Sequence, residues 1–167
     1  EAVKWYKLAA EQGEAGGQFA LGSMYYKGCQ NRLSLISCKG LKKNYSKAFK
    51  WFKLSAQQGY ADAQYSLGLM LEKGDGAQKS FKEALKWYKL AANQGSSLGQ
   101  FAIGALHSSG NLGSRNQNEA IKWWKLAAEQ GDISSQSMLG LMYEIGWDEF
   151  PGDLEESFKW YKLAAEQ

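Results

Sequence analysis

The feature that most constrains the fold of this chain is an internal repeat. A segment typified by EALKWYKLAANQG at residues 83–95 occurs in five similar copies within the 167 residues. Its tryptophan recurs at intervals of 46, 36, 36 and 37 residues, at Trp5, Trp51, Trp87, Trp123 and Trp160. A unit that recurs at such a period is typical of proteins in which each copy buries its apolar face by packing on the next copy. The repeat therefore predicts a stack of similar units.

A second segment fills the intervals between the tryptophan copies, and it is anchored by glutamine. Each copy has an apolar residue three positions after the glutamine, a glycine four positions after it and another glycine ten positions after it. The anchors are Gln18, Gln64, Gln100 and Gln136. Both segments have the length and the apolar spacing of α-helices. Each full period therefore predicts a helical hairpin, in which the glutamine segment is the first helix and the tryptophan segment is the second.

Signals for helix ends agree with this assignment. A glycine, which closes a helix in the left-handed conformation, follows eight of the nine segments. These glycines are Gly13, Gly59, Gly95 and Gly131 after second helices, and Gly28, Gly74, Gly110 and Gly146 after first helices. N-cap residues precede four second helices, at Asn44, Ser80, Asn116 and Asp153. Glu83, Glu119 and Glu156 follow three of these caps at the spacing of a capping box, in which side chains and backbone donors satisfy each other.

The second helix is predicted to contact neighbours on two sides. In the copy at 83–95, the apolar residues Ala84, Trp87, Tyr88, Leu90, Ala91 and Ala92 spread over roughly 200° of the helical wheel. We expect the tryptophan to be the large ring that fills the space left by small residues of an adjoining helix.

Two lysines occupy the remaining arc of every second helix. They are Lys4, Lys7, Lys50, Lys53, Lys86, Lys89, Lys122, Lys125, Lys159 and Lys162. Aligned in a stack, they would form a positive strip that attracts acidic partners or anionic lipid. The alternative is that they only keep an outer surface soluble, because lysine is a good helix former and nearby glutamates dilute the field.

Composition narrows the class of protein. The net charge is +3, with 22% charged residues, 44% hydrophobic residues and a single proline. These values indicate a folded chain and argue against disorder. No apolar run reaches the length of a bilayer, so we expect no membrane span. A concentrated basic groove is lacking, and we expect no nucleic-acid partner.

The motifs resemble a known repeat. Leu-Gly-x-Met-Tyr…Gly followed by Ala-x-x-Trp-Tyr-x-x-Ala-Ala-x-x-Gly, at a period of 36 residues, is similar to the Sel-1-like repeat, a relative of the tetratricopeptide repeat. The match covers essentially the whole chain as a lone second helix at 1–13 and repeats at about 14–60, 61–96, 97–132 and 133–167.

This resemblance implies an all-α fold, an alpha-alpha superhelix built as a right-handed solenoid of antiparallel helix pairs in one domain over 1–167. First helices would line the concave surface and second helices the convex one. It also implies a non-catalytic scaffold or adaptor that binds a protein or peptide partner and needs no cofactor. Because the chain begins and stops within copies of the motif, we expect a fragment whose ends would promote end-to-end self-association.

Specificity in such a stack is expected where the copies differ. Positions one, five and eight after each glutamine lie away from the packing set of the first helix. The predicted partner-binding residues are Phe19, Ser23, Tyr26, Tyr65, Leu69, Glu72, Phe101, Ala105, Ser108, Leu141 and Glu144. Their mixture of aromatic, small and acidic groups is typical of a peptide- or helix-binding groove. An alternative stays open for Phe19, Tyr65 and Phe101, which would instead pack between repeats.

The first interval is ten residues longer than the next and contains both cysteines. A disulfide between Cys29 and Cys38 would stabilise the fold by about 2–3 kcal/mol. It would also place the protein in an oxidising compartment, whether secreted, periplasmic or lumenal. The alternative is two free thiols, and since two cysteines are half a ligand set we expect no metal site. Leu33, Leu35 and Ile36 make the same segment a second candidate contact.

One motif suggests an enzyme, and it is weak. GSSLG at 95–99 fits the G-x-S-x-G elbow of hydrolases, with Ser97 as the nucleophile. That elbow requires a preceding strand and a later histidine, whereas a predicted helix precedes Ser97 and His107 is the only histidine. A turn between helices is the favoured interpretation. The alternative function is a low-activity hydrolase or β-lactam-binding protein, such as has been described for cysteine-rich relatives of the repeat family.

Overall fold

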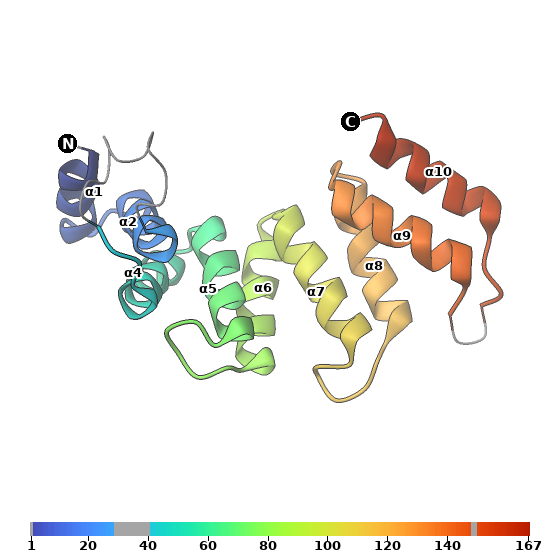
Figure 1. The fold of residues 1–167 in the computed structure, drawn as a ribbon, viewed down its shortest axis with the longest axis horizontal. Helices are drawn as coiled ribbons and strands as arrows, with labels where there is room; N and C mark the ends of the chain where they lie inside the picture. Colours follow the sequence, from blue (N-terminus) through green and yellow to red (C-terminus); the bar gives the residue numbers. More distant parts are fainter. Residues whose placement is uncertain (1, 29–40, 148–149) are drawn as a thin grey trace. The chain divides into compact units, whose positions relative to one another are not determined.

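The computed structural model describes residues 2–28, 41–147 and 150–167, and these residues are mostly helical. They form nine helices and no strand beyond an isolated bridge between Trp147 and Phe150. The first helices are α2 (Ala15–Lys27), α5 (Ala61–Lys73), α7 (Ser97–Ser109) and α9 (Ile133–Ile145). The second helices are α1 (Ala2–Glu11), α4 (Tyr45–Gln57), α6 (Phe81–Asn93), α8 (Gln117–Ala128) and α10 (Leu154–Ala165). The predicted all-α fold of helical hairpins is confirmed (Figure 1).

The chain divides into two compact units, Glu1–Ala91 and Ala92–Gln167. In the first unit, α2 packs against both α1 and α4, and α4 packs against α5. In the second unit, α7 packs against α8, α8 against α9, and α9 against α10. Within each unit a second helix thus contacts the first helix before it and the first helix after it, as the wide apolar arc predicts.

The helix ends follow the predicted chemistry, with one exception. All eight predicted closing glycines have positive φ. Each predicted N-cap side chain accepts a backbone hydrogen bond, for example Asn44 from the Lys47 N–H at 2.9 Å. The predicted capping boxes are only half formed, because the backbone N–H groups of Ser80, Asn116 and Asp153 donate to carbonyls in the last turn of the preceding first helix, which have no partner within that helix. The backbone N–H of Asn44, a cap without a following glutamate, likewise donates to the Tyr25 carbonyl at 2.8 Å.

The glutamates predicted for the capping box have another partner. Glu83, Glu119 and Glu156 form ion pairs with the lysine three residues later, at 2.6, 3.4 and 3.3 Å. These pairs lie on the exposed side of the second helices, where an ion pair contributes little to stability. The capping-box prediction is therefore right for the cap side chain and wrong for the glutamate.

The prediction that the tryptophan is the central packing ring is wrong, because the residue after it takes that place. Phe52, Tyr88 and Trp124 are 3%, 0% and 1% exposed, whereas Trp51, Trp87 and Trp123 are only partly buried. A step of one residue turns the side chain by about 100° around the helix axis. That turn directs the second aromatic of each pair into the first helix of the same hairpin.

A glycine in the first helix makes room for this ring. A Cβ atom added to Gly22 would lie 2.7 Å from the Phe52 ring, and one added to Gly140 would lie 2.7 Å from the Tyr161 ring. Gly68 and Gly104 stand in the same relation to Tyr88 and Trp124. Glycine in a helix interior costs about 1 kcal/mol relative to alanine. The close approach of helix and ring therefore explains the glycine four positions after every glutamine.

The anchoring glutamines are buried and join neighbouring helices. Gln18, Gln64 and Gln136 donate through Nε2 to the carbonyls of Ala10, Ala56 and Ala128 in the preceding second helix, at 3.3, 3.2 and 3.1 Å. A second glutamine, just after the following second helix, donates to the first. The bonds run from Gln58 to Gln18, from Gln130 to Gln100 and from Gln167 to Gln136, at 2.8, 2.7 and 3.0 Å. Gln18 and Gln136 thus satisfy their buried amides with partners on both sides.

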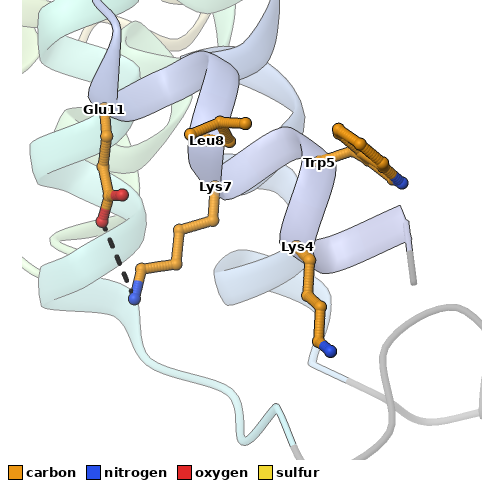
Figure 2. A pocket seen from close by; sticks show the side chains of 5 residues that line it. All are labelled: Lys4, Trp5, Lys7, Leu8 and Glu11. Atoms are coloured by element: carbon orange, nitrogen blue, oxygen red, sulfur yellow. Dashed lines mark ion pairs between the residues drawn. The ribbon is translucent and has the colours of Figure 1, made fainter.

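The first unit exposes one face of α1. Trp5 is 69% exposed, unlike the partly buried tryptophans of the other second helices. Lys4, Lys7, Leu8 and Glu11 lie beside it around an open hollow of about 500 Å³, and Lys7 extends toward Glu11, whose carboxylate lies 3.7 Å from Nζ (Figure 2). All five side chains come from a single helix, so this hollow is an open helix face.

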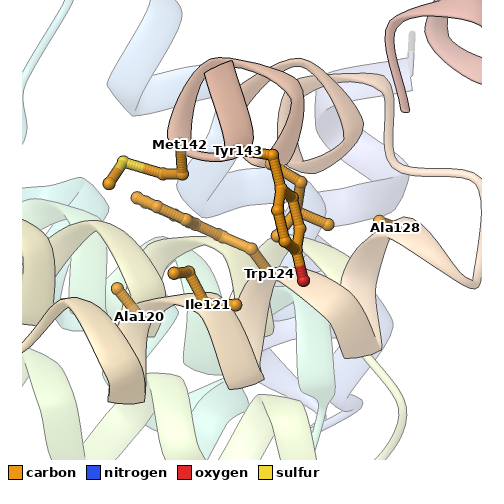
Figure 3. Packing of buried hydrophobic residues seen from close by; sticks show 7 residues of the cluster. Ala120, Ile121, Trp124, Ala128, Met142 and Tyr143 are labelled. Atoms are coloured by element: carbon orange, nitrogen blue, oxygen red, sulfur yellow. The ribbon is translucent and has the colours of Figure 1, made fainter. Parts of the chain in front are cut away.

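The second unit has its core between α8 and α9. Trp124 projects from α8 toward Met142 and Tyr143 on α9, above Ala120 and Ile121 (Figure 3). The indole N–H of Trp124 donates to the Phe101 carbonyl on α7 at 3.2 Å, which satisfies its one polar atom. Trp147 and Phe150 stack with ring centroids 4.1 Å apart, and both contact Tyr143 edge-on.

Candidate functional site

The predicted row of partner-binding residues lies on the four first helices, in two separate units. In the first unit, α2 carries Phe19, Ser23 and Tyr26, and α5 carries Tyr65, Leu69 and Glu72; all six are partly buried. In the second unit, Phe101, Ala105 and Ser108 on α7 are partly buried, and Leu141 and Glu144 on α9 are exposed.

A pocket in the first unit brings four of these residues together. It lies between α2, α4 and α5 and has a volume of about 200 Å³. Phe19, Ser23 and Tyr26 line it from α2, and Leu69 lines it from α5. Lys27, Phe52 and Ser66, which the sequence pattern did not single out, complete the lining. We call this hollow the α2–α5 pocket.

Each aromatic that follows a glutamine packs on neighbouring side chains while staying partly exposed. The Phe19 ring lies 5.7 Å from that of Phe52 and 5.2 Å from that of Tyr60. The Tyr65 ring lies 5.7 Å from that of Tyr88. Phe101 packs on the core between α8 and α9. Packing and partial exposure therefore coexist, and Phe19 serves both as a core contact and as a wall of the α2–α5 pocket.

The two predicted acidic residues are held by tyrosine hydroxyls. Tyr88 donates to Glu72 Oε2 at 2.7 Å, and Tyr161 donates to Glu144 Oε2 at 3.0 Å. Burial, followed by the hydrogen bond to Glu72, raises the pKa of Tyr88 far above its usual range. Burial, followed by the hydrogen bond to Glu144, raises the pKa of Tyr161. Both carboxylates thus have a structural partner within the hairpin.

The charged side chains near the α2–α5 pocket differ in whether they have a partner. The hydroxyl of Tyr26 donates to Asp75 Oδ2 at 3.2 Å. Lys43 lies with Nζ 4.3 Å from the centre of the Tyr45 ring, and a hydrogen bond to Tyr45, with a smaller contribution from Asp75, raises the pKa of Lys43. Lys27, at the edge of the pocket, is exposed and forms no ion pair with any residue that the structure describes. Asp75 therefore has a hydrogen-bond donor in Tyr26, whereas Lys27 has no ion-pair partner in the described part of the chain.

The residues of the enzyme hypothesis are not brought together. Ser97 is the first residue of α7, and Ser96 caps that helix by accepting from the Gly99 N–H at 3.2 Å. His107 is ten residues further along the same helix, which separates the two by roughly 15 Å along its axis. The motif thus consists of Gly95 and Ser96 in the turn between α6 and α7 and of the first three residues of α7.

The remaining candidates are the segment with the two cysteines, a metal site and a membrane span. Cys29, Cys38, Leu33, Leu35 and Ile36 lie outside the described residues. Within the described ranges, no group of three His, Cys, Asp or Glu residues is placed to hold a metal ion. None of the helices there is long and apolar enough to cross a membrane.

The repeated contacts define an α-helical repeat protein built from hairpins that share one glycine, one ring and one glutamine. The family model of the Sel1 repeat matches residues 1–14, 15–28, 29–60, 61–96, 97–132 and 133–167, so the chain belongs to the Sel1 repeat family. The resemblance seen in the sequence motifs is confirmed. Proteins of this family are generally non-catalytic scaffolds for protein interactions.

Solved structures of bacterial proteins are similar to this chain. A Sel1 repeat protein from Oxalobacter formigenes is 35% identical with a TM-score of 0.86, over 98% of this chain and 61% of that one. The protein c5321, a protective antigen present in uropathogenic Escherichia coli strains and displaying an SLR fold, is 36% identical with a TM-score of 0.86, over 99% of this chain and 33% of that one. This chain thus spans less than two thirds of either relative.

A more distant likeness concerns the fold alone. Cysteine-rich protein B from Helicobacter pylori is 22% identical with a TM-score of 0.58, over 83% of this chain and 92% of that one. No curated protein sequence matches the chain.

Proposed function

We propose that this chain is a non-catalytic adaptor that binds a protein or peptide partner through the exposed face of its first helices. The observation that carries the proposal is the α2–α5 pocket, in which four residues predicted from the repeat pattern line one hollow. Interfaces are anchored where a large side chain of one partner fills a pocket of the other.

The contrast between constant and variable positions of the repeat supports this proposal. The glycine and glutamine positions are buried in each hairpin, and each of these glycines lies against the ring of the second helix that follows it. The neighbouring row changes from copy to copy, from Phe19, Ser23 and Tyr26 on α2 to Tyr65, Leu69 and Glu72 on α5. A constant scaffold with a variable exposed row is how repeat proteins acquire specificity.

Site-specific photo-cross-linking tests the proposal. A photoreactive amino acid is placed at Ser66, in the pocket, or at Lys53, on the exposed side of α4. Each protein is irradiated in an extract of its source cells, and cross-linked proteins are identified by mass spectrometry. We expect a defined partner at Ser66 that is absent at Lys53. The same proteins at both positions, or a partner at Lys53 alone, would contradict the assignment of this face.

Self-association through the end helices is a second part of the proposal. Leu154 and Phe158 on α10 are 72% and 68% exposed, and Trp5 on α1 is exposed to a similar extent. Large apolar side chains grouped at a surface are typical of interaction sites.

A further inference from the structure

The size of the α2–α5 pocket limits what it can hold. Its volume is about 200 Å³, whereas pockets for cofactors and drug-sized ligands usually measure about 300–1,000 Å³. A buried apolar cavity of about 150 Å³ is large enough to bind benzene. The α2–α5 pocket therefore has room for one large side chain.

The lining indicates an aromatic side chain. Phe19 and Phe52 are aromatic residues of the lining, and Leu69 adds an aliphatic side chain. The hydroxyls of Ser23 and Ser66 are the small polar groups among them. An aromatic ring gains from offset or edge-on contact with other rings beyond the burial of its area.

The positive charge of Lys27 indicates that the partner carries a negative charge next to that ring. It lines the pocket, is exposed, and has no ion-pair partner among the residues whose positions are described. Asp75, an acid in contact with the pocket residue Tyr26, already accepts a hydrogen bond from the hydroxyl of Tyr26. The edge of the pocket thus presents a positive charge that complements a carboxylate.

Resting on the adaptor function proposed above, we infer that the α2–α5 pocket binds one aromatic side chain of a protein partner, and that an Asp or Glu next to this side chain pairs with Lys27. The pocket supplies most of the binding free energy through the ring. Lys27 supplies selectivity, because a basic neighbour would be repelled.

Two capped dipeptides test the inference by NMR. N-acetyl-Phe-Glu-amide and N-acetyl-Phe-Lys-amide are titrated into the 15N-labelled chain. We expect saturable shifts of the Ser23, Ser66 and Leu69 amides, with the glutamate peptide binding about two- to fivefold more tightly, as for an exposed ion pair. Equal affinity for both peptides, or shifts that avoid these three amides, would overturn the inference.

Variants separate the two parts of the site. Lys27→Glu is expected to reverse the preference between the peptides. Lys73→Glu is the matched control, because Lys73 stands at the equivalent position of α5, is exposed and does not line the pocket. Ser23→Leu is expected to fill the pocket and abolish both titrations, and its thermal unfolding is measured to confirm that it folds. Binding that survives in a folded Ser23→Leu variant would show that the ring goes elsewhere.

The peptide titrations and the cross-linking experiment distinguish failure of this inference from failure of the adaptor proposal. If the cross-linker at Ser66 captures a partner but neither dipeptide shifts the pocket amides at millimolar concentration, the inferred occupant is wrong and the adaptor function stands. If both experiments fail, both proposals are wrong.

Discussion

Gly68 on α5 faces the ring of Tyr88 on α6 so closely that a Cβ atom at Gly68 would lie 2.6 Å from Cε1 of that ring. The ring is fully buried, and the Ala84 carbonyl oxygen would lie 3.2 Å from the same Cβ. The hairpin therefore has no room for a methyl group at this position.

Gly68→Ala is expected to lower the free energy of unfolding by about 1–3 kcal/mol, because overpacking outweighs the gain in helix propensity. Gly16→Ala is the control, since Gly16 is also helical and its Cβ would meet only the flexible carboxylate of Glu14 at 3.3 Å. The control should be neutral or slightly stabilising in urea unfolding. A similar effect of both substitutions would disprove the steric argument.

Gln18→Met is expected to lower the free energy of unfolding by about 1–3 kcal/mol, because it removes two hydrogen bonds, the one to the Ala10 carbonyl and the one from the Gln58 amide. Gln57→Met, at an exposed position of α4, should change stability by less than about 0.5 kcal/mol. Urea unfolding followed by circular dichroism compares the two. Equal losses would mean that the glutamine bonds contribute no net stability.

The hydrogen bond from Tyr88 to Glu72 predicts a dependence on alkaline pH. The pKa of Tyr88 is raised in the folded chain, so above a pH of about 10 the unfolded chain loses this proton and the folded chain retains it. Stability due to this group is thus fully present below pH 10 and falls by about 1.4 kcal/mol per pH unit above it. The advantage of the natural chain over Tyr88→Phe should be constant from pH 7 to 9 and shrink above pH 10. A constant difference up to pH 11 would refute the prediction.

The exposed face of α10 predicts association that depends on protein concentration. Phe158→Glu should lower the weight-average sedimentation coefficient at high concentration, because it places a charge on the apolar face. Ser46→Glu, which adds the same charge at an exposed position of α4, should sediment like the natural chain. A natural chain that stays monomeric at all concentrations would exclude this contact.

The helices could be predicted from the sequence because their signals are local. The closing glycines and the caps such as Asn44 and Asn116 act within one turn; the glycines all have positive φ, and the cap side chains accept the predicted bonds. Local signals could not predict which of the two rings, Trp87 or Tyr88, would be buried. Both lie within the same wide apolar arc, and only contact with Gly68 on another helix decides which ring is buried.

The site was only partly predictable for the same reason. The variable row placed Phe19, Ser23 and Tyr26 on one helix face, but Phe52 and Ser66 reach the pocket from other helices, which spacing within one helix does not reveal. The role of the glutamines was missed as well. Its signal was present in the sequence, since a polar residue that recurs in the same place of every copy, among changing neighbours, indicates a buried hydrogen bond.

Gln18 bonds backward to Ala10 and receives a bond from Gln58, and the same pair of bonds links Gln136 to Ala128 and Gln167. Since these two hairpins present the same donors and acceptors to the helices beside them, gene duplication or loss of a whole period would leave such a junction chemically matched. Such a chain can change its length in evolution without redesigning any junction, and only the variable exposed row must then adapt to a new target.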